Sequence, residues 1–240
     1  MKVAARVSSA AGARTQRRVL IVDDHPIVRQ GLRRMIEAEA DLVVCGEVQT
    51  EREARAAIRA LAPDVVIVDI SLAQGDGLEL VRDVHAQQPE LPMLVLSMHD
   101  ELIFGERLLA AGASGYIMKE AAFEQLLTAL RRVLGGGRYL SDAMEKLLNA
   151  KREAGPPAAG TTDPIGRLSN RELQVLSLIG RGMSSRQAAE SLNVSVKTVE
   201  SHRQSLKRKL HLATNAQLLQ YSVQWFASRS HGTGPDDGVS

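Results

Sequence analysis

Carboxylates stand at the ends of two strongly apolar runs in the first half of the chain. The run VLIV, residues 19–22, leads directly into Asp23 and Asp24, and the run VVIV, residues 65–68, leads into Asp69. Adjacent carboxylates near low-dielectric surroundings repel each other and are costly to desolvate, so a cation is expected between them. Three carboxylates with room for water and a backbone carbonyl form the oxygen-rich kind of site that Mg²⁺ prefers.

A hydroxyl and an ammonium group follow two later apolar runs. The run MLVLS, residues 93–97, ends at Ser97, and the run GYIM, residues 115–118, is followed by Lys119. In phosphoryl transfer a carboxylate can act as the nucleophile while a metal ion, a lysine and a hydroxyl neutralise the phosphoryl oxygens. If these groups lie close together, the first half of the chain contains the side chains that phosphoryl transfer requires.

Five short apolar runs alternate with segments whose apolar residues recur every three or four positions, as in amphipathic helices. The runs are residues 19–22, 42–48, 65–68, 93–97 and 115–118. This alternation predicts βαβ units and a doubly wound, five-stranded parallel sheet with helices on both faces. The first and third strands of such a sheet are usually neighbours, and active residues collect at the carboxyl ends of the strands. The carboxylates should therefore meet at one edge.

The motifs VDDHP, VVIVDISL, LVLSMHD and GYIMK, in this order, resemble the receiver domain of bacterial two-component response regulators, a flavodoxin-like α/β fold. The resemblance spans residues 18–135. It implies that Asp69 accepts phosphate from the phosphohistidine of a sensor histidine kinase. It also implies that Asp24 binds Mg²⁺ directly, that Asp23 binds it through water, and that Asp69 and the backbone carbonyl of Ser71 complete the protein ligands.

The same resemblance gives roles to three further residues. Ser97 and Lys119 would contact the phosphoryl group, and Tyr116 matches an aromatic switch that turns inward as Ser97 moves. One departure lies after the acceptor, where the chain reads DISLAQGDG, with Leu72 and Ala73 in place of the usual Met-Pro. Loss of the proline loosens the backbone restraint on this loop, which bears on the lifetime of the phosphate.

The two halves of the chain carry opposite charge. Residues 18–135 hold 12 Lys and Arg against 19 Asp and Glu, whereas residues 165–226 hold 9 against 3. The basic half reads as helices, with a capping box at Ser169 and Glu172, a second start at Ser184 or Ser185, and Ser195 capping a third helix. Two helices joined by a tight turn, with a basic face on the third helix, predict a helix-turn-helix domain that binds nucleic acid.

From Leu168 to about Trp225 the sequence resembles the LuxR-type DNA-binding domain, and a receiver joined to this domain is the architecture of the NarL/FixJ family of transcription factors. Glu200, Ser201 and Gln204 match the base-contacting face of the third helix. Five further residues of this helix are expected to contact phosphates or to flank these contacts; they are Lys197, Thr198, His202, Arg203 and Lys207. Val199 and Leu206 are expected in the core, and a last helix near residues 215–226 is expected to contribute to dimerisation.

These observations divide the chain into five segments. We expect a disordered basic extension (1–17), the receiver (18–135), a linker with a possible helix (136–163), the all-α DNA-binding domain (164–227) and a disordered tail (228–240). No apolar run approaches the roughly 18 residues of a membrane helix, so a cytoplasmic protein without a membrane partner is expected.

We therefore expect a DNA-binding transcriptional regulator of a two-component system, controlled by phosphorylation, homodimeric when active and not an enzyme. The acidic receiver should attract the basic half, so the unphosphorylated full chain should bind DNA less tightly than residues 161–240 alone. Two alternatives stay open. A Mg²⁺-dependent phosphohydrolase would need a second acid two residues after Asp69, where Ser71 stands. A ligand-sensing LuxR-type regulator would need an aromatic-lined pocket, yet aromatic residues make up 3% of the chain.

Overall fold

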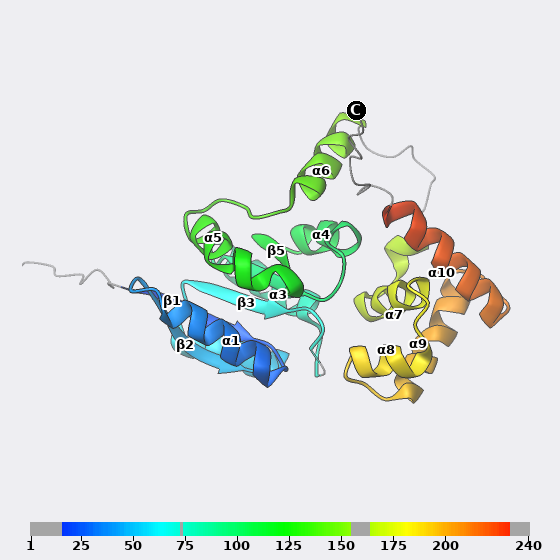
Figure 1. Ribbon diagram of the computed structural model, residues 1–240, viewed down its shortest axis with the longest axis horizontal. Helices are drawn as coiled ribbons and strands as arrows, with labels where there is room; N and C mark the ends of the chain where they lie inside the picture. The colour runs from blue at the N-terminus through cyan, green and yellow to red at the C-terminus, as the bar shows by residue number, and fades with distance from the viewer. Residues whose placement is uncertain (1–15, 73, 155–163, 231–240) are drawn as a thin grey trace, which may run out of the picture.

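Two bodies of secondary structure lie side by side in the computed structural model, which describes residues 16–72, 74–154 and 164–230 (Figure 1). The first is an α/β body and the second is entirely helical. The extension predicted for residues 1–17 and the tail predicted for residues 228–240 lie outside the described residues, apart from residues 16–17 and 228–230. Arg17 begins the first strand, and residues 228–230 end the last helix.

The first body is built on a five-stranded sheet in the order β2-β1-β3-β4-β5, with every neighbouring pair parallel. Its strands are β1 (Arg17–Val22), β2 (Leu42–Val48), β3 (Val65–Asp69), β4 (Met93–Ser97) and β5 (Gly115–Met118). Because β1 and β3 are neighbours with Val22 opposite Val68, the residues that follow these two positions emerge together at one edge. The predicted doubly wound sheet is confirmed.

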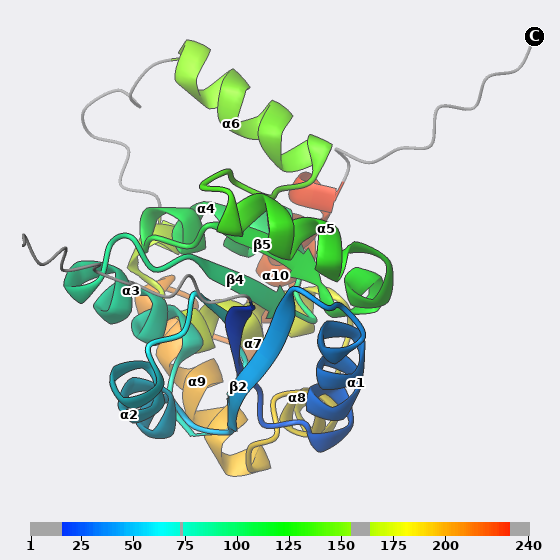
Figure 2. The same ribbon diagram turned by 90° about the vertical axis from the view of Figure 1, so that its left-hand side faces the viewer.

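Helices cover both faces of this sheet (Figure 2). Helices α1 and α5 share one face with a cluster of buried apolar residues, and α2, α3 and α4 cover the other. Their bounds are α1 (Pro26–Glu37), α2 (Glu51–Leu61), α3 (Gly77–Gln87), α4 (Glu101–Ala110) and α5 (Ala122–Leu134), with a short 3-10 turn η1 (Lys119–Ala121) before α5. Strands buried on both faces explain why the apolar runs show no polar alternation.

The segment after α5 returns along the edge strand. The backbone N–H of Tyr116 donates to the carbonyl of Tyr139, and the N–H of Tyr139 donates to that of Ser114. Helix α6 (Asp142–Ala154) then packs on α4, with Met144 fully buried against Gly105. The helix considered possible in the linker is therefore formed, and it covers part of α4.

The second body contains the 3-10 turn η2 (Pro164–Arg167) and four helices, namely α7 (Asn170–Gly180), α8 (Ser185–Ser191), α9 (Val196–Lys209) and α10 (Asn215–Ser230). Ser169 and Ser184 form capping boxes at the starts of α7 and α8, and the Ser195 side chain caps α9. Val199 and Leu206 of α9 are fully buried, as predicted. Gly182, with φ at +80°, occupies the left-handed region in the turn after α7, a conformation that glycine adopts without steric cost.

Candidate functional site

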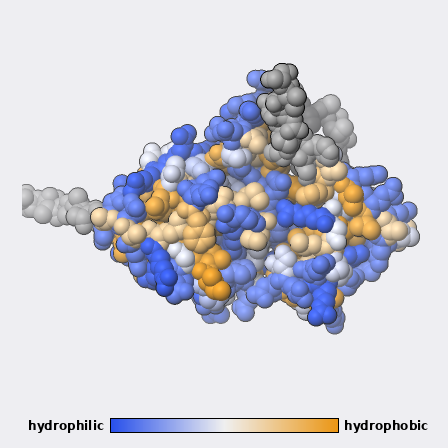
Figure 3. All heavy atoms as spheres, in the orientation of Figure 1, coloured by the Kyte–Doolittle hydropathy of each residue, from blue (hydrophilic) through white to orange (hydrophobic). Residues whose placement is uncertain are grey.

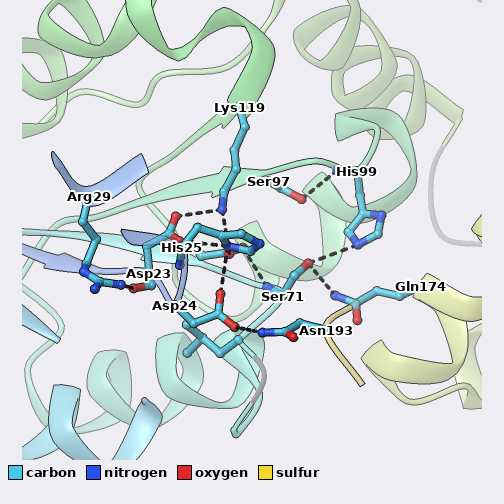
Figure 4. A network of polar contacts seen from close by, with 12 residues as sticks. Asp23, Asp24, His25, Arg29, Ser71, Ser97, His99, Lys119, Gln174 and Asn193 are labelled. Atoms are coloured by element: carbon cyan, nitrogen blue, oxygen red, sulfur yellow. Dashed lines mark hydrogen bonds and ion pairs between the residues drawn. The ribbon is translucent and has the colours of Figure 1, made fainter. Parts of the chain in front are cut away.

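The three predicted carboxylates meet at the carboxyl ends of β1 and β3. Figure 4 shows Asp23 and Asp24 beside Lys119 and His25. One oxygen from each of Asp23, Asp24 and Asp69 and a ring nitrogen of His25 all lie within 4.8 Å of one another. The side chain of Asp69 has no exposed surface, and that of Asp23 is 1% exposed. The parallel topology therefore places the acids together, as the strand order requires.

Lys119, directly after β5, lies between two of these carboxylates. Its Nζ is 2.7 Å from Asp23 Oδ2 and 2.7 Å from Asp69 Oδ2. Burial would lower the pKa of Lys119, but the charges of Asp69 and Asp23 outweigh it and raise that pKa. Burial would raise the pKa of Asp69, but the nearby His25 ring and the charge of Lys119 bring it below its usual value. Asp69 is therefore held as a carboxylate. In contrast, burial and the neighbouring Asp69 raise the pKa of Asp23.

His25 is a member of the cluster that we did not predict. Its Nδ1 lies 2.9 Å from Asp24 Oδ1, 3.1 Å from Asp23 Oδ1 and 3.7 Å from Asp69 Oδ2. The nearby Asp69 carboxylate raises the pKa of His25. In the sequence, the feature that could have pointed to this role is the position of His25 directly after Asp23 and Asp24. Lys119 and His25 thus gather on three carboxylates, whose hard oxygen donors fit a small divalent ion such as Mg²⁺.

Ser97, Tyr116 and Ser71 lie beside the carboxylates. Ser97 is fully buried, and its Oγ accepts a hydrogen bond from the His99 backbone N–H at 3.0 Å. Tyr116 points inward, and its hydroxyl donates to the His99 carbonyl at 2.6 Å. The Ser71 backbone N–H donates to Asp69 Oδ1 at 2.8 Å, which orients the carboxylate.

His99, which we also did not predict from the sequence, contacts these residues. Its Nε2 lies 3.2 Å from Ser71 Oγ, and its ring packs on Phe104 with the ring centroids 4.9 Å apart. Burial lowers the pKa of His99 to about 4, so the ring is neutral near pH 7. A histidine two residues after a strand-end serine is too common a pattern to predict this role from sequence.

Polar side chains on one face of α9 are exposed to solvent. They are Lys197, Thr198, Ser201, Gln204 and Arg208, whose spacing follows the helical repeat. Lys207 and His202 are half-buried, and burial lowers the pKa of His202. Arg203 and Glu200 instead point toward α8, where Arg203 Nη1 lies 3.3 Å from Ser185 Oγ and Glu200 Oε1 lies 2.5 Å from it. The Arg203 side chain is 15% exposed, so it braces α8 against α9.

Comparisons with known proteins agree with this arrangement. Residues 19–131 match the response regulator receiver domain, and residues 166–222 match the luxR family of bacterial regulatory proteins. The chain is 35% identical over 210 residues to the oxygen regulatory protein NreC of Staphylococcus carnosus, which covers 86% of this chain and 97% of that protein. The NreC proteins of Staphylococcus aureus give the same identity and coverage.

Solved structures show the same fold. RcsB from Salmonella enterica serovar Typhimurium, bound to the promoter rprA in the presence of the phosphomimetic BeF3−, is 29% identical, with a TM-score of 0.55 over 87% of this chain and 98% of that one. A LuxR-family two-component response regulator from Aurantimonas sp. SI85-9A1 is 33% identical, with a TM-score of 0.53 over 57% of this chain and 99% of that one.

The fold and the acidic pocket define a response regulator with a receiver domain and a LuxR-type DNA-binding domain. The chain belongs to the NarL/FixJ-type response regulators, the phosphorylation-dependent transcription regulators of two-component systems. In the part of the chain that the structure describes, no helix has the length and apolar character needed to cross a membrane.

Proposed function

We propose that Asp69 is the phosphoacceptor and that a sensor histidine kinase is the donor. A carboxylate oxygen of Asp69 attacks the phosphorus of the kinase's phosphohistidine, the P–N bond breaks, and its electron pair returns to the imidazole. The observation that carries this proposal is the setting of Asp69. Oδ1 accepts from the Ser71 backbone, Oδ2 faces Lys119 at 2.7 Å, and the pKa is held below its usual value. The nucleophile is thus ionised and oriented.

The surrounding residues fit the accessory roles of this reaction. Asp23, Asp24, Asp69 and the carbonyl of Ser71 would hold Mg²⁺, which when bound supplies positive charge to the phosphoryl oxygens. Lys119 is placed to pair with a phosphoryl oxygen. Ser97 would reach the phosphoryl group by leaving its hydrogen bond with the His99 backbone, and the inward Tyr116 would fill the space beside it.

We propose that the exposed face of α9 enters the major groove of double-stranded DNA. In a helix-turn-helix protein the second helix of the motif lies in that groove and its N-terminal residues contact base edges. Ser201 and Gln204, with Glu200 beside them, are placed to contact bases, while Lys197 and Thr198 are placed to contact phosphates. Arg203, His202 and Lys207 would support or flank these contacts, since they are half-buried.

We also propose that the active form is a homodimer joined through α10. Leu219 and Val223 lie one helical turn apart and are 47% and 44% exposed. Apolar surface gathers over α10 in Figure 3. In a symmetric dimer such an apolar stripe packs against the same stripe of the second copy. The two DNA-binding domains can then contact two half-sites on the DNA.

Regulation, rather than turnover of a substrate, is the function that the site supports. A phosphohydrolase would need a second acid two residues after Asp69, but that position holds Ser71, whose hydroxyl contacts His99 and Gln174. We propose that the chain acts in the cytoplasm, where its DNA partner lies. The proposal is tested by phosphorylating the full chain with phosphoramidate and Mg²⁺ and measuring its DNA affinity before and after. Tighter binding after labelling of Asp69 is expected; unchanged affinity of a fully labelled chain would contradict phosphorylation control.

A further inference from the structure

A buried glutamine of the DNA-binding domain reaches the loop that carries the phosphoacceptor. Gln174 of α7 is fully buried, and its Nε2 lies 3.3 Å from Ser71 Oγ, two residues after Asp69 (Figure 4). Ser71 Oγ in turn lies 3.2 Å from His99 Nε2. Three side chains from α7, from the loop after β3 and from the loop after β4 thus form a continuous polar chain.

The donors and acceptors of this chain agree with its geometry. The Gln174 amide donates to Ser71 Oγ, which shares a second hydrogen bond with His99 Nε2. A buried side-chain hydrogen bond that loses one partner leaves the other unsatisfied, so the three groups depend on one another.

His99 connects this chain to the predicted switch. Its backbone N–H donates to Ser97 Oγ, and its backbone carbonyl accepts from the Tyr116 hydroxyl. Any movement of Ser97 toward a phosphoryl group on Asp69 breaks the first of these bonds. One of the bonds that position His99 is then lost, which weakens the contact of its ring with Ser71 and, through Ser71, the contact with Gln174.

Further contacts join the DNA-binding domain to the same loops. Arg171 donates to the Leu72 carbonyl, and Asn170 Nδ2 donates to Asp76 Oδ1 at 3.0 Å. Asn193, in the turn before α9, lies with its Nδ2 3.5 Å from Asp24 Oδ2. Arg107 of α4 donates to backbone carbonyls at the start of the second body. The domain therefore holds both segments that carry the acidic residues.

This arrangement bears on access to Asp69. Its side chain has no exposed surface, so a phosphodonor reaches it only after neighbouring groups move. The acidic receiver also lies beside the turn that begins α9, the end expected to enter the groove, where it would repel DNA phosphates. Opening of the interface thus favours both phosphorylation and DNA binding.

We propose that Gln174, Ser71 and His99 form a hydrogen-bonded coupling through which the DNA-binding domain restrains phosphorylation of Asp69, so that double-stranded DNA activates phosphorylation. Coupling between two binding sites is reciprocal, so a ligand that favours the open form at one site favours it at the other. The inference rests on the proposed function, because it assumes Asp69 as acceptor and α9 as the DNA-binding helix.

The test measures the initial rate of phosphorylation by phosphoramidate and Mg²⁺ in the full-length chain. Gln174→Ala should raise this rate about fivefold, since one hydrogen bond between the domains is lost. Gln174→Asn, which keeps the amide but shortens the side chain, should give a smaller increase in the same direction. Gln87→Ala, at an exposed glutamine at the end of α3, is the matched control and should leave the rate unchanged.

The second part of the experiment measures the phosphorylation rate in the presence of duplex DNA. A mixed-sequence duplex at low salt binds mainly through phosphate contacts, so no operator is needed. It should speed phosphorylation of the unaltered chain and of Gln87→Ala, and have little effect on Gln174→Ala, whose interface is already weakened. Ser71→Ala combined with Gln174→Ala should change the rate by much less than the product of the two single effects, because both remove the same contact.

Two outcomes would overturn the coupling. The first is a Gln174→Ala rate equal to that of the unaltered chain, with equal stimulation by DNA. The second is a Ser71→Ala effect that simply multiplies with that of Gln174→Ala. Either result leaves the proposed function intact provided that Asp69 is labelled. Labelling that persists in Asp69→Asn would instead reject the proposed function itself. Circular dichroism melts of every variant separate loss of coupling from loss of folding.

Discussion

Lys119 Nζ lies 2.7 Å from Asp69 Oδ2, although 50 residues separate them in the chain. The contact joins the ends of β5 and β3, two strands separated in the sheet by β4. A lysine in this position favours the ionised form of Asp69 and lies where it could contact an oxygen of a phosphoryl group attached to Asp69. The same contact explains how a carboxylate without exposed surface stays charged.

Replacing Asp69 by Asn should abolish phosphorylation by acetyl phosphate or carbamoyl phosphate, because the nucleophilic carboxylate is lost while the shape is kept. Removing Mg²⁺ with EDTA should abolish it in the unaltered chain as well. Intact-protein mass spectrometry measures the added phosphoryl group. Asp83→Asn, on the exposed side of α3, is the control and should be labelled normally. Undiminished labelling of Asp69→Asn would mean that another residue is the acceptor.

Two substitutions on α9 should separate phosphate contacts from base contacts. Lys197→Ala should weaken binding to all DNA sequences by similar factors and lower the slope of log affinity against log salt by about one. Gln204→Ala should leave that slope unchanged and relax the preference among sequences. Fluorescence anisotropy over a salt series, with duplexes chosen by in vitro selection, measures both. The assignments are wrong if the two variants exchange these effects.

Glu172 should contribute to stability in a pH-dependent way. Its carboxylate accepts from Lys209 Nζ at 2.7 Å and Ser205 Oγ at 2.6 Å. Burial would raise the pKa of Glu172, but these bonds and that of the capping box lower it from 4.5 to about 2. Because the folded pKa is the lower one, the stabilisation is present above pH 4.5 and disappears as the pH falls toward about 2. This contribution to the free energy of unfolding is at most on the order of 3 kcal/mol.

Urea unfolding at two pH values tests the role of Glu172. At pH 7 the variant Glu172→Gln should unfold at a lower urea concentration than the unaltered chain, and the difference should shrink at about pH 3. Glu190→Gln, an exposed acid on α8, should behave like the unaltered chain at both pH values. A Glu172→Gln deficit that stays constant with pH would show that shape rather than charge matters at this position.

Leu219→Lys should weaken the dimer of the phosphorylated chain by at least about tenfold, because an unpaired charge would be buried between two copies of α10. Sedimentation velocity measures the dimer, and binding to a two-half-site duplex should weaken in parallel. Gln220→Lys adds the same charge at the neighbouring exposed position and serves as the control. Dimers of unchanged stability in Leu219→Lys would place the interface elsewhere.

Local sequence patterns were sufficient to predict the strands, the caps and the edge where the acids meet. An apolar run followed by Asp23 or Asp69 identifies a buried strand and its end from a few adjacent residues. One topological rule, that parallel strands end on the same side, then brings these ends together. Ser169 and Ser195 were equally predictable, because a cap depends on the three residues that follow it.

The orientation of individual side chains was not predictable in the same way. Arg203 belongs to the basic helix in sequence, yet the packing of α8 on α9 brings it to Ser185. His25 and His99 acquire their contacts from the loops that surround them. A residue type and its position on an element do not specify which of several neighbours its side chain contacts.

The contact between the two domains was decided by tertiary structure alone. Opposite charges on the two halves predicted attraction but not which surfaces meet. Gln174 and Ser71 are 103 residues apart, and no periodicity or motif relates them. Their contact depends on the fit of α7 against the loop after β3, a sum of many weak interactions between residues distant in the chain. The sequence by itself therefore predicted both domains and the candidate residues of each, whereas the contact between the domains required the three-dimensional arrangement.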